Sequence, residues 1–215
     1  MNRKTTSRDR AAIADEPTFG ALLRTIVKPR STSLASGKTL FHRGDNVHRF
    51  FVVTEGRVRL VRHLADGRIV VLQTARRGDA LAEGSLFSET YHCDATAETN
   101  SHVDVYDRDD VLRALDESSV LGRLFSRRLA AEVQGLRSSL EVRNIKLARD
   151  RILTYFELVS RDGRIVLDRP LKELAAEIGL SHEVLYRTLA KLEKEGLIER
   201  ERNEIRLVRS SGGSM

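Results

Sequence analysis

Two runs of apolar residues at helical spacing, separated by a glycine, occupy the segment Pro170 to Leu192. In the first run the apolar residues recur every third or fourth position, at Leu171, Leu174, Ala175 and Ile178. The second run has the same spacing, at Val184, Leu185, Leu189 and Leu192. Each run places its side chains on one face of a helix. Gly179 suits the left-handed end of the first helix and Ser181 suits the N-cap of the second, so the spacing predicts a helix-turn-helix.

The residues that follow, 196–208, predict a small β-hairpin. An apolar pair leads into a turn around Asn203, after which apolar and polar residues alternate. Ahead of the helix-turn-helix, the pattern predicts a helix over Leu147 to Val159 and a short strand at 165–167. Together these elements predict a winged helix-turn-helix domain over residues 147–209, with the hairpin as its wing.

The N-terminal half of the chain has a different period. Segments rich in β-branched and aromatic residues alternate with glycine-containing turns, and these segments are Phe50 to Thr54, Val58 to Arg62, Ile69 to Thr74 and Val103 to Tyr106. Asp66-Gly67 between two apolar runs is a hairpin signal. Short strands with glycines at nearly regular intervals are typical of a compact antiparallel barrel or jelly roll, which we expect over residues 21–110.

Residues 111–146 contain no proline and predict one long helix. Apolar residues recur along it at three- and four-residue steps, at Leu129, Val133, Leu136 and Leu140. Such a narrow seam is what a two-stranded coiled coil presents, so we expect this helix to form a homodimer interface. The alternative is a helix that packs only on its own barrel. The predicted fold class is α+β, with an N-terminal β-roll, a dimerisation helix and a C-terminal winged helix-turn-helix.

Composition narrows the class of protein. A chain of 215 residues with 40% hydrophobic residues can bury a substantial core. The sequence has no apolar run of about 18 residues and no apolar stretch behind its N-terminal charges, so we expect no membrane span, no secretory signal and a cytoplasmic location. The single cysteine, Cys93, cannot form an intramolecular disulfide or supply the thiolates of an iron–sulfur cluster.

The formal charge of +6 is unevenly distributed. Residues 1–32 hold 7 Lys or Arg against 3 Asp or Glu, residues 33–145 hold 16 of each, and residues 146–215 hold 14 against 12. A flexible basic arm at residues 1–20 and a mildly basic C-terminal domain suit a polyanionic partner, but so small an excess does not establish one. The composition of the arm is equally compatible with a solubilising tail. Residues 210–215 are predicted to form a flexible tail.

The outward face of the second helix carries the candidate chemistry. Its first turns present His182, Glu183, Tyr186 and Arg187, next to the N-cap Ser181. In a helix-turn-helix these turns enter the major groove of DNA. Arginine has the geometry to bind guanine, and a carboxylate accepts from the amino group of cytosine. We therefore expect these five residues to contact double-stranded DNA.

Several motifs of this chain have counterparts in one known family. They are F-H-R-G-D (41–45), F-F-V-V-T-E-G-R-V-R-L (50–60), R-G-D (77–79), A-E-G-S-L-F (82–87) and L-S-H-E-V-L-Y-R-T-L-A-K-L-E-K-E-G-L-I (180–198). Through them the chain, from about residue 20 to 209, resembles the cyclic-AMP receptor protein/fumarate-nitrate regulator (CRP/FNR) family of bacterial transcription regulators.

The resemblance implies roles for individual residues. In this family the recognition helix has the form S/T-x-E-x-x-x-R, which Ser181, Glu183 and Arg187 match. It implies that Glu183 and Arg187 read a C·G pair in each half-site of a TGA-type palindrome, and that the variable positions His182 and Tyr186 set this protein's own preference. It also implies that the DNA-bound homodimer contacts RNA polymerase.

The resemblance also points to a candidate effector pocket. Members that bind cyclic nucleotides use a glutamate for the ribose and an arginine-serine pair for the phosphate. Glu83 matches the glutamate, whereas Cys93 and Asp94 occupy the other two positions. A carboxylate at Asp94 repels a phosphate, and no cation lies nearby in sequence, so we do not expect cyclic AMP as the ligand.

The same segment leaves other chemistry open. His92 and Cys93 are candidate ligands for haem or a metal ion, or a candidate redox pair. Adjacent strand residues point to opposite faces, which favours an exposed His92 and a buried Cys93 with no ligand.

Three classes of function remain for comparison. The sequence favours a homodimeric DNA-binding transcription regulator that is either controlled by an effector or constitutively active. The competing interpretation is a ligand- or redox-sensing module whose winged domain contacts protein. We expect no enzyme, because the sequence shows no Ser/His/Asp or Cys/His constellation, no phosphate-binding glycine loop and no metal-ligand cluster, so we assign no catalytic residue, metal ligand or cofactor.

Overall fold

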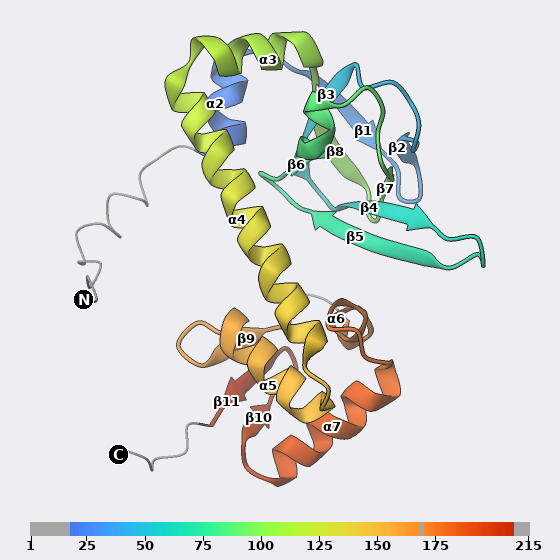
Figure 1. The fold of residues 1–215 in the computed structure, drawn as a ribbon, viewed down its shortest axis with the longest axis vertical. Helices are drawn as coiled ribbons and strands as arrows, with labels where there is room; N and C mark the ends of the chain where they lie inside the picture. Colours follow the sequence, from blue (N-terminus) through green and yellow to red (C-terminus); the bar gives the residue numbers. More distant parts are fainter. Residues whose placement is uncertain (1–17, 168–169, 209–215) are drawn as a thin grey trace. The chain divides into compact units, whose positions relative to one another are not determined.

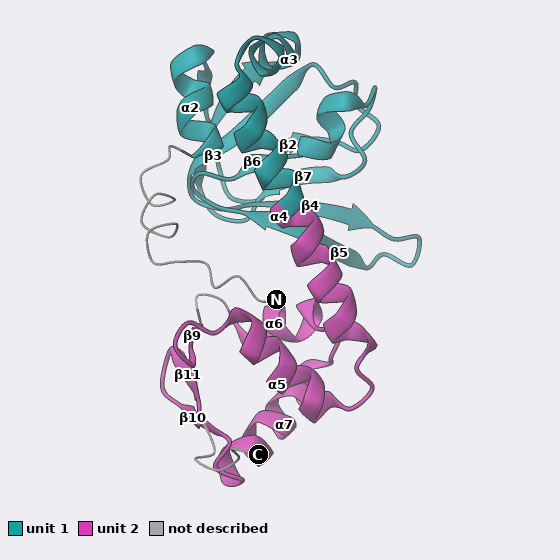
Figure 2. Cartoon of the chain, turned by 60° about the vertical axis from the view of Figure 1, so that its left-hand side comes forward, with its two compact units in different colours: residues 1–130 teal, residues 131–215 magenta. Residues whose placement is uncertain are grey.

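The computed structural model describes residues 18–167 and 170–208 of the chain. The described residues divide between two compact units, with the boundary between Ala130 and Ala131 (Figures 1 and 2). The predicted N-terminal arm at 1–20 lies almost entirely outside the described residues, and so does the predicted tail at 210–215.

The first unit contains a β-roll made of two four-stranded antiparallel sheets, with strand orders β1-β8-β3-β6 and β2-β7-β4-β5. The strands are β1 (Arg30–Leu34), β2 (Thr39–Phe41), β3 (Arg49–Glu55), β4 (Val58–His63), β5 (Ile69–Ala75), β6 (Ala80–Leu81), β7 (Asp94–Ala97) and β8 (Ser101–Asp107). The four strands that alternation predicted correspond to β3, β4, β5 and β8. Strand β1 was not predicted, because its sequence R-S-T-S-L has no alternation and its first four residues are exposed.

Strand β3 shows why the roll has two hydrophobic cores. Phe51 and Val53 face the core between the two sheets, where Phe41, Leu60 and Ala95 also pack. The alternate residues of β3, Phe50 and Val52, belong to a second core that includes side chains of the helices. A strand that is covered on both faces reads as a continuous apolar run, as F-F-V-V does here.

Helices α2 (Phe19–Ile26), α3 (Arg108–Glu117) and α4 (Ser119–Asn144) and a short 3-10 helix, η1 (Glu83–Phe87), complete this part of the chain. The prediction of a single helix over 111–146 was wrong, because Ser118 separates α3 from α4 in an extended conformation. The Ser118 N–H donates to the carbonyl of Ala114, and its hydroxyl accepts from the N–H of Leu121 at 3.2 Å. One serine thus ends one helix and caps the next.

Helix α4, at 26 residues, runs across the boundary between the two units. Within the described ranges, no helix combines the length and the apolar character that crossing a membrane requires.

The second unit is a small α/β domain built on one core. Its elements are α5 (Ala148–Val159), β9 (Arg164–Val166), α6 (Leu171–Glu177), α7 (His182–Lys194), β10 (Ile198–Arg200) and β11 (Glu204–Leu207). The strands form a sheet in the order β10-β11-β9, and the buried faces of α5, α6 and α7 share one hydrophobic cluster. This arrangement confirms the predicted winged helix-turn-helix, with β10 and β11 as the wing.

Gly56 and Gly67 offer a matched test of the roll. Both have positive φ, at 79° and 80°, but an alanine Cβ at Gly56 would clash with the backbone of Asn100, whereas nothing lies within 4 Å of one at Gly67. We expect Gly67→Ala to lower the free energy of unfolding by about 1–2 kcal/mol through backbone strain alone. Gly56→Ala should cost at least about 1 kcal/mol more, through overpacking. Urea unfolding followed by circular dichroism compares the two, and equal losses would contradict the crowding at Gly56.

Candidate nucleic-acid interface

The turn between α6 and α7 fixes the direction of the second helix. Gly179 adopts φ of 69°, and the N–H of Leu180 donates to the carbonyl of Ala175 at 2.9 Å, as in a Schellman end. Arg143 donates to the carbonyl of Glu177 at 2.9 Å, and Arg151 donates to that of Gly179 at 3.0 Å. The helix end is therefore held by two guanidinium groups as well as by its own backbone.

Helix α7 has one buried face and one exposed face. Leu185, Leu189 and Leu192 have no solvent exposure. The Ser181 hydroxyl accepts from the N–H of Val184 at 3.3 Å and caps the helix as predicted. On the opposite face, the five predicted DNA contacts are all exposed: Ser181, His182, Glu183, Tyr186 and Arg187. Because the first face is closed by packing, these outward side chains are available to a partner.

Glu183 is ionised more readily than an ordinary glutamate. Its carboxylate accepts from its own backbone N–H and from the Ser181 hydroxyl, and these hydrogen bonds, with a smaller contribution from nearby His182, hold the pKa of Glu183 below its usual value. An exposed carboxylate that remains charged at neutral pH is an acceptor only. It is suited to the amino group of cytosine.

Arg187 lies one helical turn after Glu183, and no described carboxylate forms an ion pair with it. Most arginines of the wing are engaged within the domain. Arg200 pairs with Glu193 at 3.8 Å, and Arg206 pairs with Glu199 at 3.6 Å. The small net charge of this domain is therefore compatible with a guanidinium on the exposed face of α7 that no described carboxylate pairs with.

The two variable positions on this face form a contact pair. The rings of His182 and Tyr186 lie four residues apart, with centroids 4.3 Å from one another and planes tilted by 55°. The two side chains therefore present one aromatic surface beside Glu183 and Arg187.

A cavity of about 500 Å³ adjoins the recognition helix, and sequence reasoning did not anticipate it. It is lined by Tyr186, by the start of α6 and by the wing turn from Arg200 to Asn203. Arg202 in this turn is exposed and has no ion pair with a described carboxylate. The position of Arg202 at the tip of the predicted hairpin could have been used to predict a further phosphate contact, because arginines often bind DNA phosphates.

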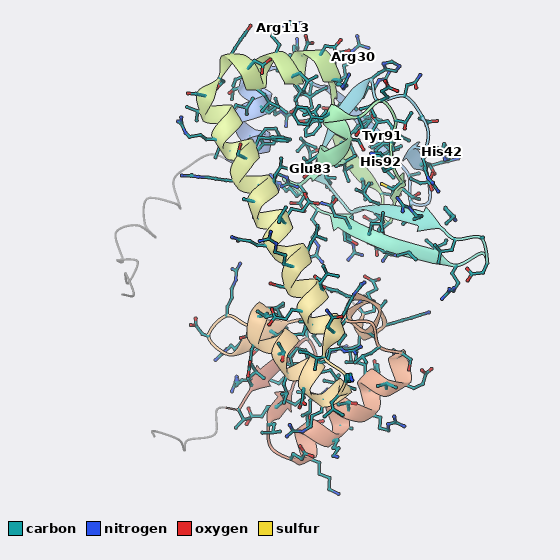
Figure 3. All side chains as sticks on the ribbon, viewed as in Figure 1. Arg30, His42, Glu83, Tyr91, His92 and Arg113 are labelled. Atoms are coloured by element: carbon teal, nitrogen blue, oxygen red, sulfur yellow. The ribbon has the colours of Figure 1, made fainter. Side chains whose placement is uncertain are left out.

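The three candidate effector residues are held in three different environments. Glu83 is 2% exposed and pairs with Arg128 of α4 at 2.5 Å. Cys93 is buried in the core between the sheets. Figure 3 places Glu83 beside α4 and His42, a partner of Asp94, on the far side of the roll. The three side chains therefore have separate sets of neighbours within the roll.

Asp94 has partners that its sequence neighbourhood did not reveal. Its carboxylate accepts from the backbone N–H of Arg43 at 2.9 Å. The imidazoles of His42 and His63 lie 3.4 and 3.8 Å from its two oxygens. As expected, no cation lies near Asp94 in sequence, and its partners come from segments that are distant along the chain.

His92 and Cys93 follow the expected alternation. His92 is exposed, with Nε2 3.2 Å from the Ser88 hydroxyl, whereas Cys93 is 6% exposed. Burial raises the pKa of the Cys93 thiol, outweighing the opposite effect of Arg62. The thiol form of Cys93 is therefore favoured, and reactivity towards oxidants is low. No group of three or more His, Cys, Asp or Glu side chains suited to a metal ion occurs within the described ranges.

The four seam residues of α4 do not share one environment. Val133, Leu136 and Leu140 are 46%, 57% and 62% exposed. Leu129, in contrast, is partly buried against the helical core of the first unit. Three of the four apolar seam residues are therefore largely open to solvent in the single chain.

A winged helix-turn-helix with a charged and aromatic recognition face defines a DNA-binding protein. The sequence comparisons agree with this class. Residues 31–118 match the cyclic nucleotide-binding domain model, and residues 145–211 match the Crp-like helix-turn-helix domain model. The chain belongs to the CRP/FNR family and is a DNA-binding transcription regulator.

Several relatives can be named. The chain is 28% identical over 170 residues to the transcriptional regulator LdrP of Thermus thermophilus, covering 76% of this chain and 85% of the relative. It is 27% identical over 164 residues to the cyclic AMP receptor protein of the same species, covering 75% and 76%. The solved structure of FixK2 from Bradyrhizobium japonicum has the same fold, with a TM-score of 0.66, 19% identity, and coverage of 84% of this chain and 93% of that one.

Proposed function

We propose that this protein regulates transcription as a homodimer that reads a TGA-type palindrome, with Glu183 and Arg187 on a C·G pair in each half-site. The observation that carries the proposal is the pairing of an exposed carboxylate with a reduced pKa and an uncommitted guanidinium, one turn apart on α7. Guanine offers two acceptors to arginine, and cytosine offers one donor to a carboxylate, so the pair of side chains matches the pair of bases. His182 and Tyr186 supply the contacts that distinguish flanking bases.

Arg187→Ala tests the base contact. We expect the variant to lose about 1–3 kcal/mol of binding to a TGA-type palindromic duplex and to lose its preference over a duplex with the C·G pair exchanged. Fluorescence anisotropy at fixed salt measures both affinities. The matched control is Arg113→Ala, which removes the same charge from an exposed position on α3. Retained discrimination in Arg187→Ala would show that another residue reads this pair.

The uncovered seam of α4 supports the homodimer. Three large apolar side chains at three- and four-residue steps form a stripe that water contacts in the single chain. Full burial of such a side chain contributes about 1.5–3 kcal/mol, and burying the exposed half of each contributes roughly half of that. A two-fold dimer would present two copies of α7 to half-sites about one DNA turn apart. Leu129 contributes less than the sequence predicted, since the chain's own helices already cover part of it.

The double variant Val133→Asp/Leu140→Asp should be monomeric, because it places two carboxylates in this seam. Size-exclusion chromatography with light scattering measures the mass. Ala131→Asp/Gln134→Asp is the control, since both positions are exposed on other faces of the same helix. We expect the control to remain dimeric and to bind the palindrome. A dimer that persists in the seam variant would place the interface elsewhere.

We also propose that cyclic AMP is not the effector, although a relative is named for binding it. Both polar positions that would hold the nucleotide are engaged within the chain, Glu83 by Arg128 and Asp94 by His42, His63 and the backbone of Arg43. A cyclic phosphate would meet the thiol of Cys93 in place of an arginine and the carboxylate of Asp94 in place of a serine. Separating Glu83 from Arg128 would break the ion pair of a buried carboxylate, which costs about 3–5 kcal/mol.

Isothermal titration calorimetry with cyclic AMP should give only heats of dilution for the wild-type protein. The cyclic AMP concentration should reach about 1 mM, so that binding with a dissociation constant below about 1 mM is also detected. Titration of the same sample with palindromic duplex serves as the control that the protein is active. Saturable cyclic AMP binding with one site per chain would contradict the assignment of Asp94 to the phosphate position.

Two further properties are proposed from the family. The DNA-bound dimer is expected to contact RNA polymerase, and the protein is expected to act in the cytoplasm, where its DNA target lies. The family membership supports both.

A further inference from the structure

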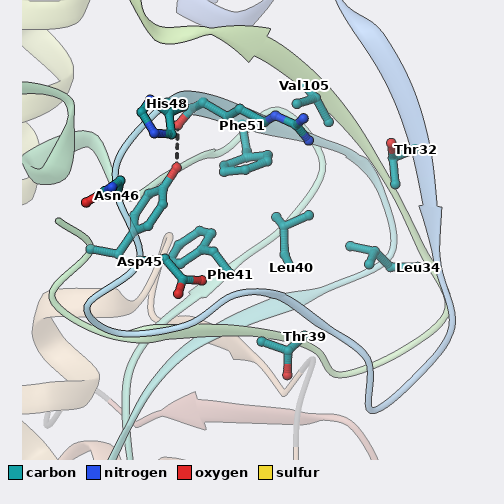
Figure 4. Close-up of a pocket in the computed structure, with 12 residues that line it drawn as sticks. Thr32, Leu34, Thr39, Leu40, Phe41, Asp45, Asn46, His48, Phe51 and Val105 are labelled. Carbon is teal, nitrogen blue, oxygen red and sulfur yellow. Dashed lines mark hydrogen bonds between the residues drawn. The ribbon is translucent and has the colours of Figure 1, made fainter. Parts of the chain in front are cut away.

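The first unit contains a cavity of about 490 Å³ at one side of the roll (Figure 4). Strand β1 is an outer strand of one sheet and β2 is an outer strand of the other, and the cavity is lined by residues of both. Its volume is typical of a site for a small organic molecule. Glu83, Cys93 and Asp94 are not among its lining residues, so it is distinct from the candidate effector positions.

Apolar side chains form one part of the cavity wall, and polar residues such as Thr32, Thr39 and His48 form another. Leu34 comes from β1, Leu40 from β2, Phe51 from β3 and Val105 from β8, and Figure 4 shows all four around the same space. Leu34, Leu40 and Val105 pack on the core between the sheets but are only partly buried. The core of the roll is therefore open at this edge, and an apolar ligand bound there would shield these three side chains from water.

A fixed aromatic stack adjoins these walls. The rings of Phe41 and Tyr91 stack with centroids 3.8 Å apart, and those of Phe41 and Phe51 stack at 5.5 Å. The Tyr91 hydroxyl donates to the carbonyl of Arg49 at 2.6 Å. Burial raises the pKa of Tyr91 to about 12, so this hydroxyl stays neutral and remains a donor. The surface is thus pre-formed, which reduces the entropy lost on binding.

Arg49 supplies one positive charge at the cavity. Because side chains alternate along a strand, Arg49 lies on the same face of β3 as Phe51, which faces the inside of the roll. Arg49 is exposed and forms no ion pair with a described carboxylate.

Two carboxylates close to Arg49 in the fold are already engaged. Asp45, which also lines the cavity, accepts from the N–H of His42 at 2.8 Å. Asp107, which pairs with Arg49 across the sheet, caps α3 by accepting from the N–H of Asp109 at 3.0 Å. The guanidinium of Arg49 is therefore available to an external anion.

We propose that this cavity binds a small aromatic monoanion, such as an aromatic carboxylate, with its apolar body between Leu34, Leu40 and Phe51 and its charged group on Arg49. An arginine and a carboxylate form a strong charge-assisted hydrogen bond. A nucleotide fits less well, because several negative charges would meet one arginine and the carboxylate of Asp45. This site does not depend on the DNA-binding function.

The test compares two fluorescent dyes with nearly the same body. The dye 8-anilinonaphthalene-1-sulfonate carries one negative charge, and N-phenyl-1-naphthylamine carries none. We expect saturable binding of the anionic dye at one per chain, with an affinity about ten-fold higher than that of the neutral dye. Arg49→Gln should abolish this preference and leave neutral-dye binding unchanged. Arg43→Gln, at an exposed arginine outside the lining, is the matched control and should behave as wild type.

A second variant tests the walls of the cavity. Leu40→Trp fills the space between Leu34 and Phe51, so it should reduce binding of both dyes at least ten-fold while circular dichroism shows the wild-type fold. The absence of saturable binding to the wild type would overturn the proposal. So would an unchanged dye preference in Arg49→Gln, because the dyes would then bind another apolar surface, such as the exposed Ile69 to Leu72 of β5.

Discussion

The burial of one stripe of leucines on α7 determines which face of this helix is exposed for DNA binding. Leu185, Leu189 and Leu192 are fully buried, and each contributes about 1.5–3 kcal/mol by leaving water. A helix fixed in this way cannot rotate about its axis without exposing that stripe. The opposite face, with Glu183 and Arg187, is therefore pre-organised for a rigid duplex, and the entropy of ordering these positions is lost during folding rather than on binding.

The roll has the fold of a nucleotide-binding domain, but its polar groups serve the chain itself. Arg128 neutralises Glu83, which is nearly inaccessible to solvent, and also pairs with Asp79 at 3.5 Å. On the far side of the roll, two imidazoles and a backbone N–H surround Asp94. A buried charge is expensive to separate from its partner, so the contact with Arg128 fixes Glu83 within the roll. The open edge beside Arg49 is a separate feature of the same domain.

Local periodicity predicted most of the secondary structure, because burial on one face or on both leaves a signature in sequence. The helix-turn-helix, its wing and four strands of the roll were found in this way. The signature fails where an element is polar on both faces, as in β1, and where one side chain changes the course of the chain, as Ser118 does. For the site, exposure of the five recognition residues followed from their position opposite the leucines. The contacts of Asp94 with His42 and His63 did not, because they join segments that meet only through sheet pairing.

Recognition of the C·G pair by Arg187 is tested most directly by replacing single atoms of the DNA. In a TGA-type palindrome, replacement of each half-site guanine of the C·G pair by 7-deazaguanine removes the N7 acceptor without changing the base pair. If Arg187 binds this edge, the wild-type protein should lose about 1–3 kcal/mol on the modified duplex, whereas Arg187→Ala should bind both duplexes equally. Equal binding of the two duplexes by the wild-type protein would contradict the central claim that α7 reads this base pair through Arg187.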